Sequence, residues 1–214
     1  AVALRAPDPH GHRIVWAPGH MLKIAILASG SGTNAQRLME HFGAHERARV
    51  ALIGCDQPGA GVLQRAWDHG VPAYLFTGAQ LKEGTVQREL EGQGIGLIVL
   101  AGFMRLIPAA MVRTFPQRII NIHPALLPKF GGRGMYGHHV HEAVIAAGEK
   151  ESGITIHYVN ERYDEGEHIA QVRCPVLPDD TPDALAERIH ALEHRHYPEV
   201  VERVVNAWEV GGQH

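Results

Sequence analysis

Short apolar runs alternate with longer segments of helical periodicity through the first half of the chain, from residue 21 to residue 122. The near-continuous apolar character of these runs is typical of parallel strands buried on both faces. Between them, Ala35, Leu38 and Phe42 recur at i, i+3 and i+7, which predicts one face of a helix. The predicted strands are Lys23–Ala28, Arg49–Cys55, Pro72–Phe76, Ile95–Ala101 and Arg118–Ile122, and the further predicted helices are Gly61–His69, Gln80–Glu91 and Pro108–Phe115. This alternation predicts a Rossmann-like α/β fold, with helices on both faces of a mostly parallel sheet.

The second half departs from this rhythm. A helix and two further strands are predicted at Gly137–Ala147, Gly153–Asn160 and His168–Val176. Because the turn Glu161–Glu167 joins the two strands directly, we expect a β-hairpin that extends the sheet. Thr181 followed by Pro182 is a typical helix start, with threonine as the cap and proline at the first position. It opens a long amphipathic C-terminal helix, Asp183–Ala207.

The first twenty residues differ from the rest of the 214-residue chain. Ala1–His20 is rich in Pro, Gly, Arg and His and has no sustained period. It lacks the apolar core of about 7–15 residues that a secretory signal requires. Gly19-His20-Met21 is typical of a cloning-site junction, so we interpret residues 1–20 as a dispensable vector-derived leader. Residues 21–214 then form one domain, of ordinary size for a single core.

Composition excludes several classes of function. The formal charge of −3 gives no electrostatic reason to expect nucleic acid as a partner. No apolar run approaches the roughly 20 residues of a membrane span. The two cysteines, Cys55 and Cys174, lie far apart without a C-x-x-C motif, which favours a reducing cytoplasm over a disulfide framework. His138, His139 and His141 are adjacent but have few partners at ligand spacing, so no metal site is predicted.

A glycine-rich loop, Gly30–Asn34, joins the first strand to the first helix. Glycines allow the backbone to approach a phosphate closely, and a helix N-terminus supplies free N–H groups. With Ala35, the loop also matches the G-x-G-x-x-A fingerprint, and Asp56 follows at the end of the second strand. Three interpretations are therefore open: a phosphate site, a nicotinamide-dinucleotide site with Asp56 on the ribose, or a tight turn without a ligand.

Asn121-Ile122-His123-Pro124, with the acidic turn Tyr163–Gly166 further along the chain, indicates acyl-transfer chemistry. An amide can donate to a carbonyl oxygen that becomes an oxyanion, and an imidazole can move a proton. A carboxylate such as Asp164 can orient that imidazole and raise its pKa.

From about Met21 to Ala207 the chain resembles the phosphoribosylglycinamide formyltransferase family. The resemblance lies in three motifs that occur in the family's order, at residues 100–105 (LAGFMR), 121–130 (NIHPALLPKF) and 153–164 (GITIHYVNERYD). It implies that a formyl group passes from 10-formyltetrahydrofolate to the amine of glycinamide ribonucleotide in purine biosynthesis, with no metal and no covalent intermediate.

The resemblance also implies roles for single residues. The implied catalytic residues are Asn121, His123 and Asp164. The residues implied to bind the ribonucleotide are Gly32, Thr33 and Asn34 at its phosphate, and Glu193. Those implied to bind the folate are Met104, Arg105, Leu106, Ile107, Asn121, Asn160, Glu161, Arg162, Tyr163 and Asp164.

Two segments depart from the family's pattern. The arginine that the family usually offers to folate near position 83 is absent, since the chain there reads Lys82-Glu83-Gly84. The sequence leaves both possibilities open, that Lys82 contacts the folate in place of this arginine and that it does not. The segment Gly131–His139 is longer than its counterpart, and its four glycines suggest a flexible loop beside the site.

Related activities remain as alternatives. Methionyl-transfer-RNA formyltransferases and formyltetrahydrofolate hydrolases share the catalytic triad, but they have additional domains. A nucleotide-binding module without enzymatic activity would keep the glycine loop and has no need for Asn121, His123 and Asp164 together. Monomer and homodimer are both compatible with the sequence.

Overall fold

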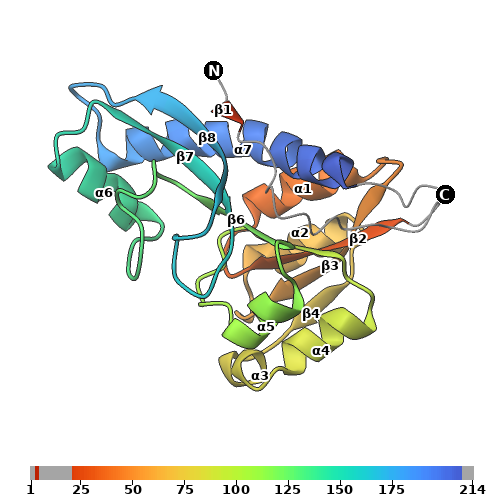
Figure 1. Cartoon of the computed structure of the whole chain (residues 1–214). Helices are drawn as coiled ribbons and strands as arrows, with labels where there is room; N and C mark the ends of the chain where they lie inside the picture. The colour runs from red at the N-terminus through yellow and green to blue at the C-terminus, as the bar shows by residue number, and fades with distance from the viewer. Residues whose placement is uncertain (1–2, 5–20, 209–214) are drawn as a thin grey trace.

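The computed structural model describes residues 3–4 and 21–208, and its sheet lies between two layers of helices (Figure 1). The strands are β1 (Ala3–Leu4), β2 (Leu22–Ala28), β3 (Ala48–Cys55), β4 (Ala73–Leu75), β5 (Leu97–Leu100), β6 (Ile119–His123), β7 (Glu151–Tyr158) and β8 (His168–Pro175). The helices are α1 (Thr33–Phe42), α2 (Gly61–Asp68), α3 (Gly78–Lys82), α4 (Thr85–Gly92), α5 (Ala109–Thr114), α6 (His138–Ala146) and α7 (Pro182–Ala207).

The sheet confirms the predicted Rossmann-like fold. Its strand order is β1-β8-β7-β6-β5-β2-β3-β4. The pairs β6–β5, β5–β2, β2–β3 and β3–β4 are parallel. Strand β7 instead pairs antiparallel with both β6 and β8. From β2, near the centre of the sheet, the chain moves outward to β4 and then returns to the other side of β2 with β5. This reversal between β2 and β5 leaves a crevice at their carboxyl ends, which is where open α/β sheets bind ligands.

Strand β2 shows how the apolar runs form two cores. Its side chains alternate in direction, so that Ile24 and Ile26 pack with α1, α2 and α7 on one face of the sheet. Ala25 and Leu27 pack with α4 and α5 on the other face. All four are completely buried. Full burial of an isoleucine or leucine side chain contributes about 1.5–3 kcal/mol, which explains why these runs tolerate almost no polar residue.

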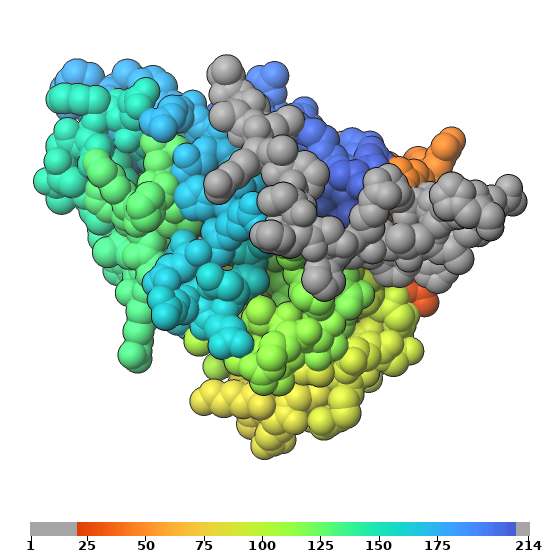
Figure 2. Space-filling view, viewed as in Figure 1, coloured from red at the N-terminus to blue at the C-terminus, as the bar shows by residue number. Residues whose placement is uncertain are grey.

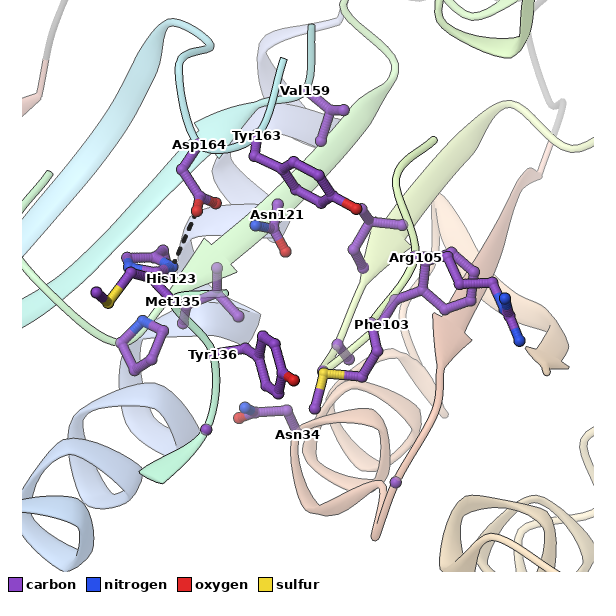
Figure 3. Close-up of a pocket in the computed structure, with 18 of the residues that line it drawn as sticks. Asn34, Phe103, Arg105, Asn121, His123, Met135, Tyr136, Val159, Tyr163 and Asp164 are labelled. Atoms are coloured by element: carbon purple, nitrogen blue, oxygen red, sulfur yellow. Dashed lines mark ion pairs between the residues drawn. The ribbon is translucent and has the colours of Figure 1, made fainter. Parts of the chain in front are cut away.

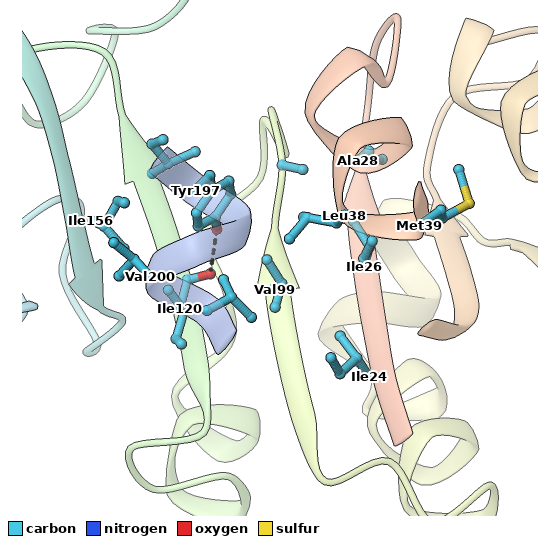
Figure 4. Close-up of a cluster of buried hydrophobic side chains, with 14 of the residues drawn as sticks. Ile24, Ile26, Ala28, Leu38, Met39, Val99, Ile120, Ile156, Tyr197 and Val200 are labelled. Atoms are coloured by element: carbon cyan, nitrogen blue, oxygen red, sulfur yellow. Dashed lines mark hydrogen bonds between the residues drawn. The ribbon is translucent and has the colours of Figure 1, made fainter. Parts of the chain in front are cut away.

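Helix α7 crosses the sheet and contacts α1 and α6. Its predicted start is confirmed, because the Thr181 side chain accepts a hydrogen bond from the Ala184 N–H and Pro182 occupies the first turn. The completely buried Tyr197 donates its hydroxyl to the Leu100 carbonyl oxygen at 2.7 Å and, at a longer 3.3 Å, to that of Ile120. Figure 4 shows the bond to Ile120. These bonds fix α7 against the carboxyl end of β5 and against β6, on the face that also holds the first core.

The turn between β7 and β8 leans toward α5. Arg113 Nη1 of α5 lies 3.1 Å from Glu161 Oε1 of this turn. Figure 2 shows the turn, in cyan, against the green surface of α5. The turn starts beside the amino end of β6, where the Val159 N–H donates to the Ile119 carbonyl oxygen at 2.9 Å. It bends back so that Asp164 lies 3.5 Å from His123, at the other end of that strand.

The predicted helix Gln80–Glu91 is wrong as a single element, because the structure divides it into α3 and α4. Thr77 and Gln80 form a capping box at the start of α3. Gly84 then adopts a left-handed conformation with φ of 79° and becomes the N-cap of α4. Glycine takes this conformation without the steric cost of a Cβ, so it ends one helix and begins the next.

Two residues of the predicted leader lie within the described part of the chain. Ala3 and Leu4 pair antiparallel with Gln171 and Ala170 and so add a short edge strand to β8. Residues 1–2 and 5–20 lie outside the described residues, and their origin in a vector stays a prediction. Within the described ranges, no helix is long and apolar enough to cross a membrane.

Candidate active site

A cavity of about 590 Å³ opens at the carboxyl ends of β2, β5 and β6, in the crevice where the strand order reverses. This volume lies within the range of about 300–1,000 Å³ that is typical of small-molecule sites. The glycine loop, the segment after β5, the end of β6, the Gly131–His139 loop, the β7–β8 turn and helix α7 all contribute to its wall. Figure 3 shows side chains from these segments converging on one space.

Asn121 and His123 project into this cavity from the same face of β6, because strand residues two apart point in the same direction. On the neighbouring strand β7, His157 pairs with Asn121 across the ladder. The Asn121 Nδ2 atom lies 3.2 Å from His157 Nε2. Three polar side chains are therefore grouped at a position where the surrounding strand residues are buried and apolar.

Asp164 completes the group from the β7–β8 turn. Its carboxylate lies between two imidazoles, with Oδ2 at 3.5 Å from His123 Nδ1 and Oδ1 at 3.7 Å from His157 Nε2. The Gly132 N–H donates to Oδ2 at 2.9 Å. Asp164 has a φ of 55°, which non-glycine residues rarely adopt. Such local strain is typical of functional positions held by the surrounding structure.

The hydrogen bonds of His123 define which of its nitrogens can exchange a proton. Its Nε2 lies 2.7 Å from the carbonyl oxygen of Phe130. A carbonyl oxygen only accepts hydrogen bonds, so Nε2 carries a proton. Nδ1, which faces Asp164, is then the basic nitrogen of the neutral ring. A proton taken up at Nδ1 is stabilised by the adjacent carboxylate.

The pKa of His123 corrects one expectation. Burial lowers this pKa below its ordinary value and outweighs Asp164 and the Phe130 carbonyl, which both raise it. His123 is only 3% exposed, so its charged form loses most of its hydration. Asp164 thus acts in the expected direction without raising the pKa above the ordinary value.

The pKa of the Asp164 carboxyl is lowered in turn. Burial acts to raise it, but the His157 hydrogen bond, the charge of His123 and the Gly132 N–H together outweigh burial. Asp164 is therefore ionised at neutral pH, as the role predicted for it beside an imidazole requires.

The orientation of Asn121 is fixed by His157. The His157 Nδ1 atom lies 2.9 Å from the Tyr158 carbonyl oxygen and donates to it. The Asn121 Nδ2 atom approaches Nε2 of the same ring at 3.2 Å. Since the amide nitrogen carries two hydrogens, at least one is available for a substrate oxygen in the cavity.

The glycine loop forms the opposite end of the cavity. Gly32 has a φ of 77°, and a Cβ there would lie 2.5 Å from the Val62 side chain. Gly32 therefore serves both a left-handed turn and a close helix–loop contact. Thr33 begins α1, so its amide and those that follow point toward the cavity as a ready anion site.

Asn34 and Glu193, which are distant in the sequence, are brought together. The Asn34 Nδ2 atom donates to Glu193 Oε2 at 3.0 Å. Burial raises the pKa of the Glu193 carboxyl, and the Asn34 hydrogen bond opposes that shift. Glu193 lies one turn before the anchored Tyr197 and so faces the cavity beside the glycine loop.

The segment after β5 lines the central part of the cavity. Met104 and Leu106 are 50% and 42% exposed, whereas Ile107 is buried beneath them. Arg105 also borders the cavity, but its Nε atom lies 2.6 Å from a carboxylate oxygen of Asp56. The segment thus offers apolar walls and backbone groups to a flat ring.

The opposite wall contains only part of the predicted set. Arg162, Tyr163 and Asp164 line the cavity. Asn160 instead accepts from the Arg162 N–H within the turn, and Glu161 points toward α5. Neither lines the cavity, and their implied contact with folate stays a prediction. Lys82 is exposed at the end of α3 and does not line the cavity either, so the arginine expected near position 83 has no identified substitute.

The surroundings of Asp56 argue against the dinucleotide interpretation. Its side chain is completely buried and accepts hydrogen bonds from Ser29, Gln57 and Arg105. A carboxylate that holds a ribose must reach the ligand, and this one is enclosed by protein donors. The ribose contact that a dinucleotide needs is therefore missing, and the role of the glycine loop as a phosphate site stays a prediction.

Sequence reasoning missed His157 and Gly132. The polar positions of β6 and β7 gave a signal for His157, because Asn121, His123, Thr155 and His157 alternate with apolar residues on adjacent strands. Gly132 acts through its backbone N–H, which no residue type reveals. Among the described residues, no group of three or more His, Cys, Asp or Glu side chains is arranged to hold a metal ion.

Comparison with known proteins agrees with this geometry. Residues 22–201 match the formyl transferase family model. The chain belongs to the formyl transferase family.

The chain is 40% identical over 188 residues to the chloroplastic phosphoribosylglycinamide formyltransferase of Arabidopsis thaliana. The aligned residues make up 84% of this chain and 64% of that protein. It is 36% identical to phosphoribosylglycinamide formyltransferase of Bacillus subtilis (strain 168), covering 86% of this chain and 95% of that protein. It spans only 14% of the trifunctional purine biosynthetic protein adenosine-3 of Drosophila melanogaster.

The fold is likewise similar to solved structures. The crystal structure of glycinamide ribonucleotide transformylase 1 from Symbiobacterium toebii aligns with a TM-score of 0.81 and 38% identity, covering 88% of this chain and 89% of that chain. Because one plant relative is chloroplastic, a cytoplasmic location for this chain stays a prediction.

Proposed function

We propose that this protein transfers a formyl group from 10-formyltetrahydrofolate to the amine of glycinamide ribonucleotide. The observation that supports it most directly is the convergence of Asn121, His123 and Asp164 in a cavity that also contains an anion-binding glycine loop. The relatives that match nearly full length, such as the Bacillus subtilis protein, are named for this activity. Whether the chain is a monomer or a homodimer stays a prediction.

The reaction needs an oxyanion donor and a proton carrier. The substrate amine attacks the formyl carbon, forms a new C–N bond, and places negative charge on the formyl oxygen of a tetrahedral intermediate. The free N–H of Asn121 donates to this oxygen. Collapse then breaks the bond from the formyl carbon to folate N10, which gains a proton while the amine nitrogen loses one.

His123 is suited to move these protons through Nδ1. Phe130 holds the ring by its Nε2–H, and Asp164 stabilises the imidazolium that forms when Nδ1 takes a proton. Because burial keeps the pKa of His123 below its ordinary value, the protonated ring is an acid that readily gives up its proton. A positioned acid–base group typically contributes about 10²–10⁴-fold to the rate.

The two substrates fit opposite ends of the cavity. The phosphate of the ribonucleotide would lie on the α1 N-terminus at Gly32–Asn34, with Glu193 close to its sugar. The folate ring would lie between Met104–Ile107 and the Tyr163 side of the turn. The reacting groups then meet near Asn121 and His123.

Spectrophotometric release of tetrahydrofolate distinguishes this activity from the hydrolase alternative. We expect release only when glycinamide ribonucleotide is present. Equal release without the ribonucleotide would identify a hydrolase and contradict the proposal.

Gly32→Val is expected to raise the Michaelis constant for glycinamide ribonucleotide far more than that for folate. The valine side chain would collide with Val62 and disturb the left-handed turn that directs the α1 amides. Steady-state kinetics with each substrate varied in turn measures the effect, and Gly94→Val, at an exposed helix end with open space around it, gives a control for strain alone. Equal increases in both constants would show that the loop does not serve the ribonucleotide.

A further inference from the structure

An ion pair with a buried carboxylate joins the ends of three strands behind the cavity wall. Asp56 follows β3, and its side chain is completely enclosed. The carboxylate accepts from Ser29 Oγ at 2.6 Å, from Arg105 Nε at 2.6 Å and from Gln57 Nε2 at 3.1 Å. Ser29 follows β2 and Arg105 follows β5, so a single carboxylate links both sides of the crevice.

The network holds the segment after β5 at two points. Ser29 Oγ, besides donating to Asp56, accepts from the Met104 N–H at 3.0 Å. Asp56 thus fixes Met104 through Ser29 and fixes Arg105 directly. These residues begin the exposed apolar wall Met104–Leu106 of the cavity. No other side-chain hydrogen bond is described for the backbone of this wall, so Asp56 is its main polar anchor within the described chain.

Close packing beside Arg105 limits its alternatives. A Cβ at Gly78, the first residue of α3, would lie 2.6 Å from Arg105 Nη1. The guanidinium therefore fits between α3 and the Asp56 carboxylate. Because the Arg105 side chain is 41% exposed, Asp56 is the buried member of the pair, and its carboxylate would lose compensation if the guanidinium moved away.

The glycine loop does not depend on Asp56 in the same way. The backbone of Ser29 is held independently, since its N–H donates to the Gly102 carbonyl oxygen at 3.1 Å. Arg65 Nε separately donates to the Ser31 carbonyl oxygen at 2.8 Å. A change at Asp56 should therefore reach the segment after β5 before it reaches the phosphate end.

We propose that Asp56 is a positioning residue for the folate slot: it sets the Met104–Leu106 wall through Ser29 and Arg105 and does not touch either substrate. The inference rests on the proposed function only in taking the ligand of this wall to be a folate. It gives the acidic residue that follows β3 a role different from the ribose contact that a dinucleotide fingerprint would assign to it.

Asp56→Asn tests this role, because asparagine keeps the size of the side chain and removes its charge. The dissociation constants of the variant are measured calorimetrically for 5-formyltetrahydrofolate, as a folate probe that need not react, and for glycinamide ribonucleotide. We expect the dissociation constant for the folate probe to rise by about tenfold, because the variant replaces a charge-assisted hydrogen bond with a weaker neutral one. Ribonucleotide binding should change by less than about twofold on the same scale.

Two further variants make the result specific. Ser29→Ala should weaken folate binding in the same direction, and the double variant with Asp56→Asn should cost less than the sum of the two, because the residues share one network. Asp68→Asn, at an exposed carboxylate on α2 that accepts from Gln64, is the matched control and should change neither constant.

Equal weakening of both ligands, or additive effects of Ser29→Ala and Asp56→Asn, would overturn the positioning role. A parent protein that binds the folate probe but transfers no formyl group would contradict the proposed function and leave this binding test valid. A parent that does not bind the folate probe would overturn both.

Discussion

Combining His123→Ala with Asp164→Asn is expected to cost hardly more turnover than His123→Ala alone. His123→Ala should lower kcat by about 10²–10⁴-fold, the usual contribution of a positioned acid–base group. Asp164 acts through the ring, since its carboxylate faces His123 Nδ1 at 3.5 Å. Once the ring is absent, the carboxylate has no proton carrier to stabilise, and coupled catalytic residues are not additive.

The pH profile of Asp164→Asn gives an independent readout. The carboxylate raises the pKa of His123, so its removal leaves burial less opposed and lowers that pKa further. If the protonated ring is required, activity is lost as pH rises through this pKa; if the neutral ring is required, activity is lost as pH falls through it. In both cases the limb assigned to His123 moves to lower pH. Rates measured across pH for the parent and the three variants check the shift, and additive costs with an unchanged profile would reduce Asp164 to a turn residue.

Asn121→Ala is expected to lower kcat by about 10²–10³-fold, as the loss of one oxyanion donor typically does. The variant also removes the amide that contacts His157 Nε2, but it leaves the His123–Asp164 pair in place. The pH profile should therefore keep its shape while its height falls. Asn206→Ala, at an exposed position near the end of α7, serves as the control for loss of an amide elsewhere. A profile that shifts along the pH axis, with little loss of rate at its maximum, would assign Asn121 to the tuning of His123 instead of the oxyanion.

Much of the fold could be predicted from the sequence because its dominant signal is local. The apolar runs of β2, β5 and β6 are buried on both faces, and this requirement is visible in each run separately. The division of α3 from α4 was not predicted, since a single glycine does not by itself end a predicted helix, and it is the left-handed conformation of Gly84 that separates the two. The pairing of Ala3–Leu4 with β8 was not predicted either, because two residues carry no period.

The candidate site was predictable only where residue type reveals chemistry. Asn121 and His123 lie two apart on one strand, so their common direction follows from the sequence. Asp164 is distant from them in the sequence and lies near them only because of how the β7–β8 turn folds, so its assignment depended on family resemblance. The pKa of His123 was judged from charge alone, whereas the burial that dominates it comes from segments distant in the chain. The same holds for Asp56, whose partners Ser29 and Arg105 meet only in the folded protein.

Transfer of an isotopic label tests the central claim most directly. The protein is incubated with 10-formyltetrahydrofolate labelled with ¹³C at the formyl carbon, together with unlabelled glycinamide ribonucleotide, and the products are followed by nuclear magnetic resonance. The proposed mechanism predicts that the label appears on the ribonucleotide amine in step with tetrahydrofolate release, one formyl group for each folate, and that His123→Ala slows both equally. Label appearing as free formate, or folate consumed without labelled ribonucleotide, would contradict it.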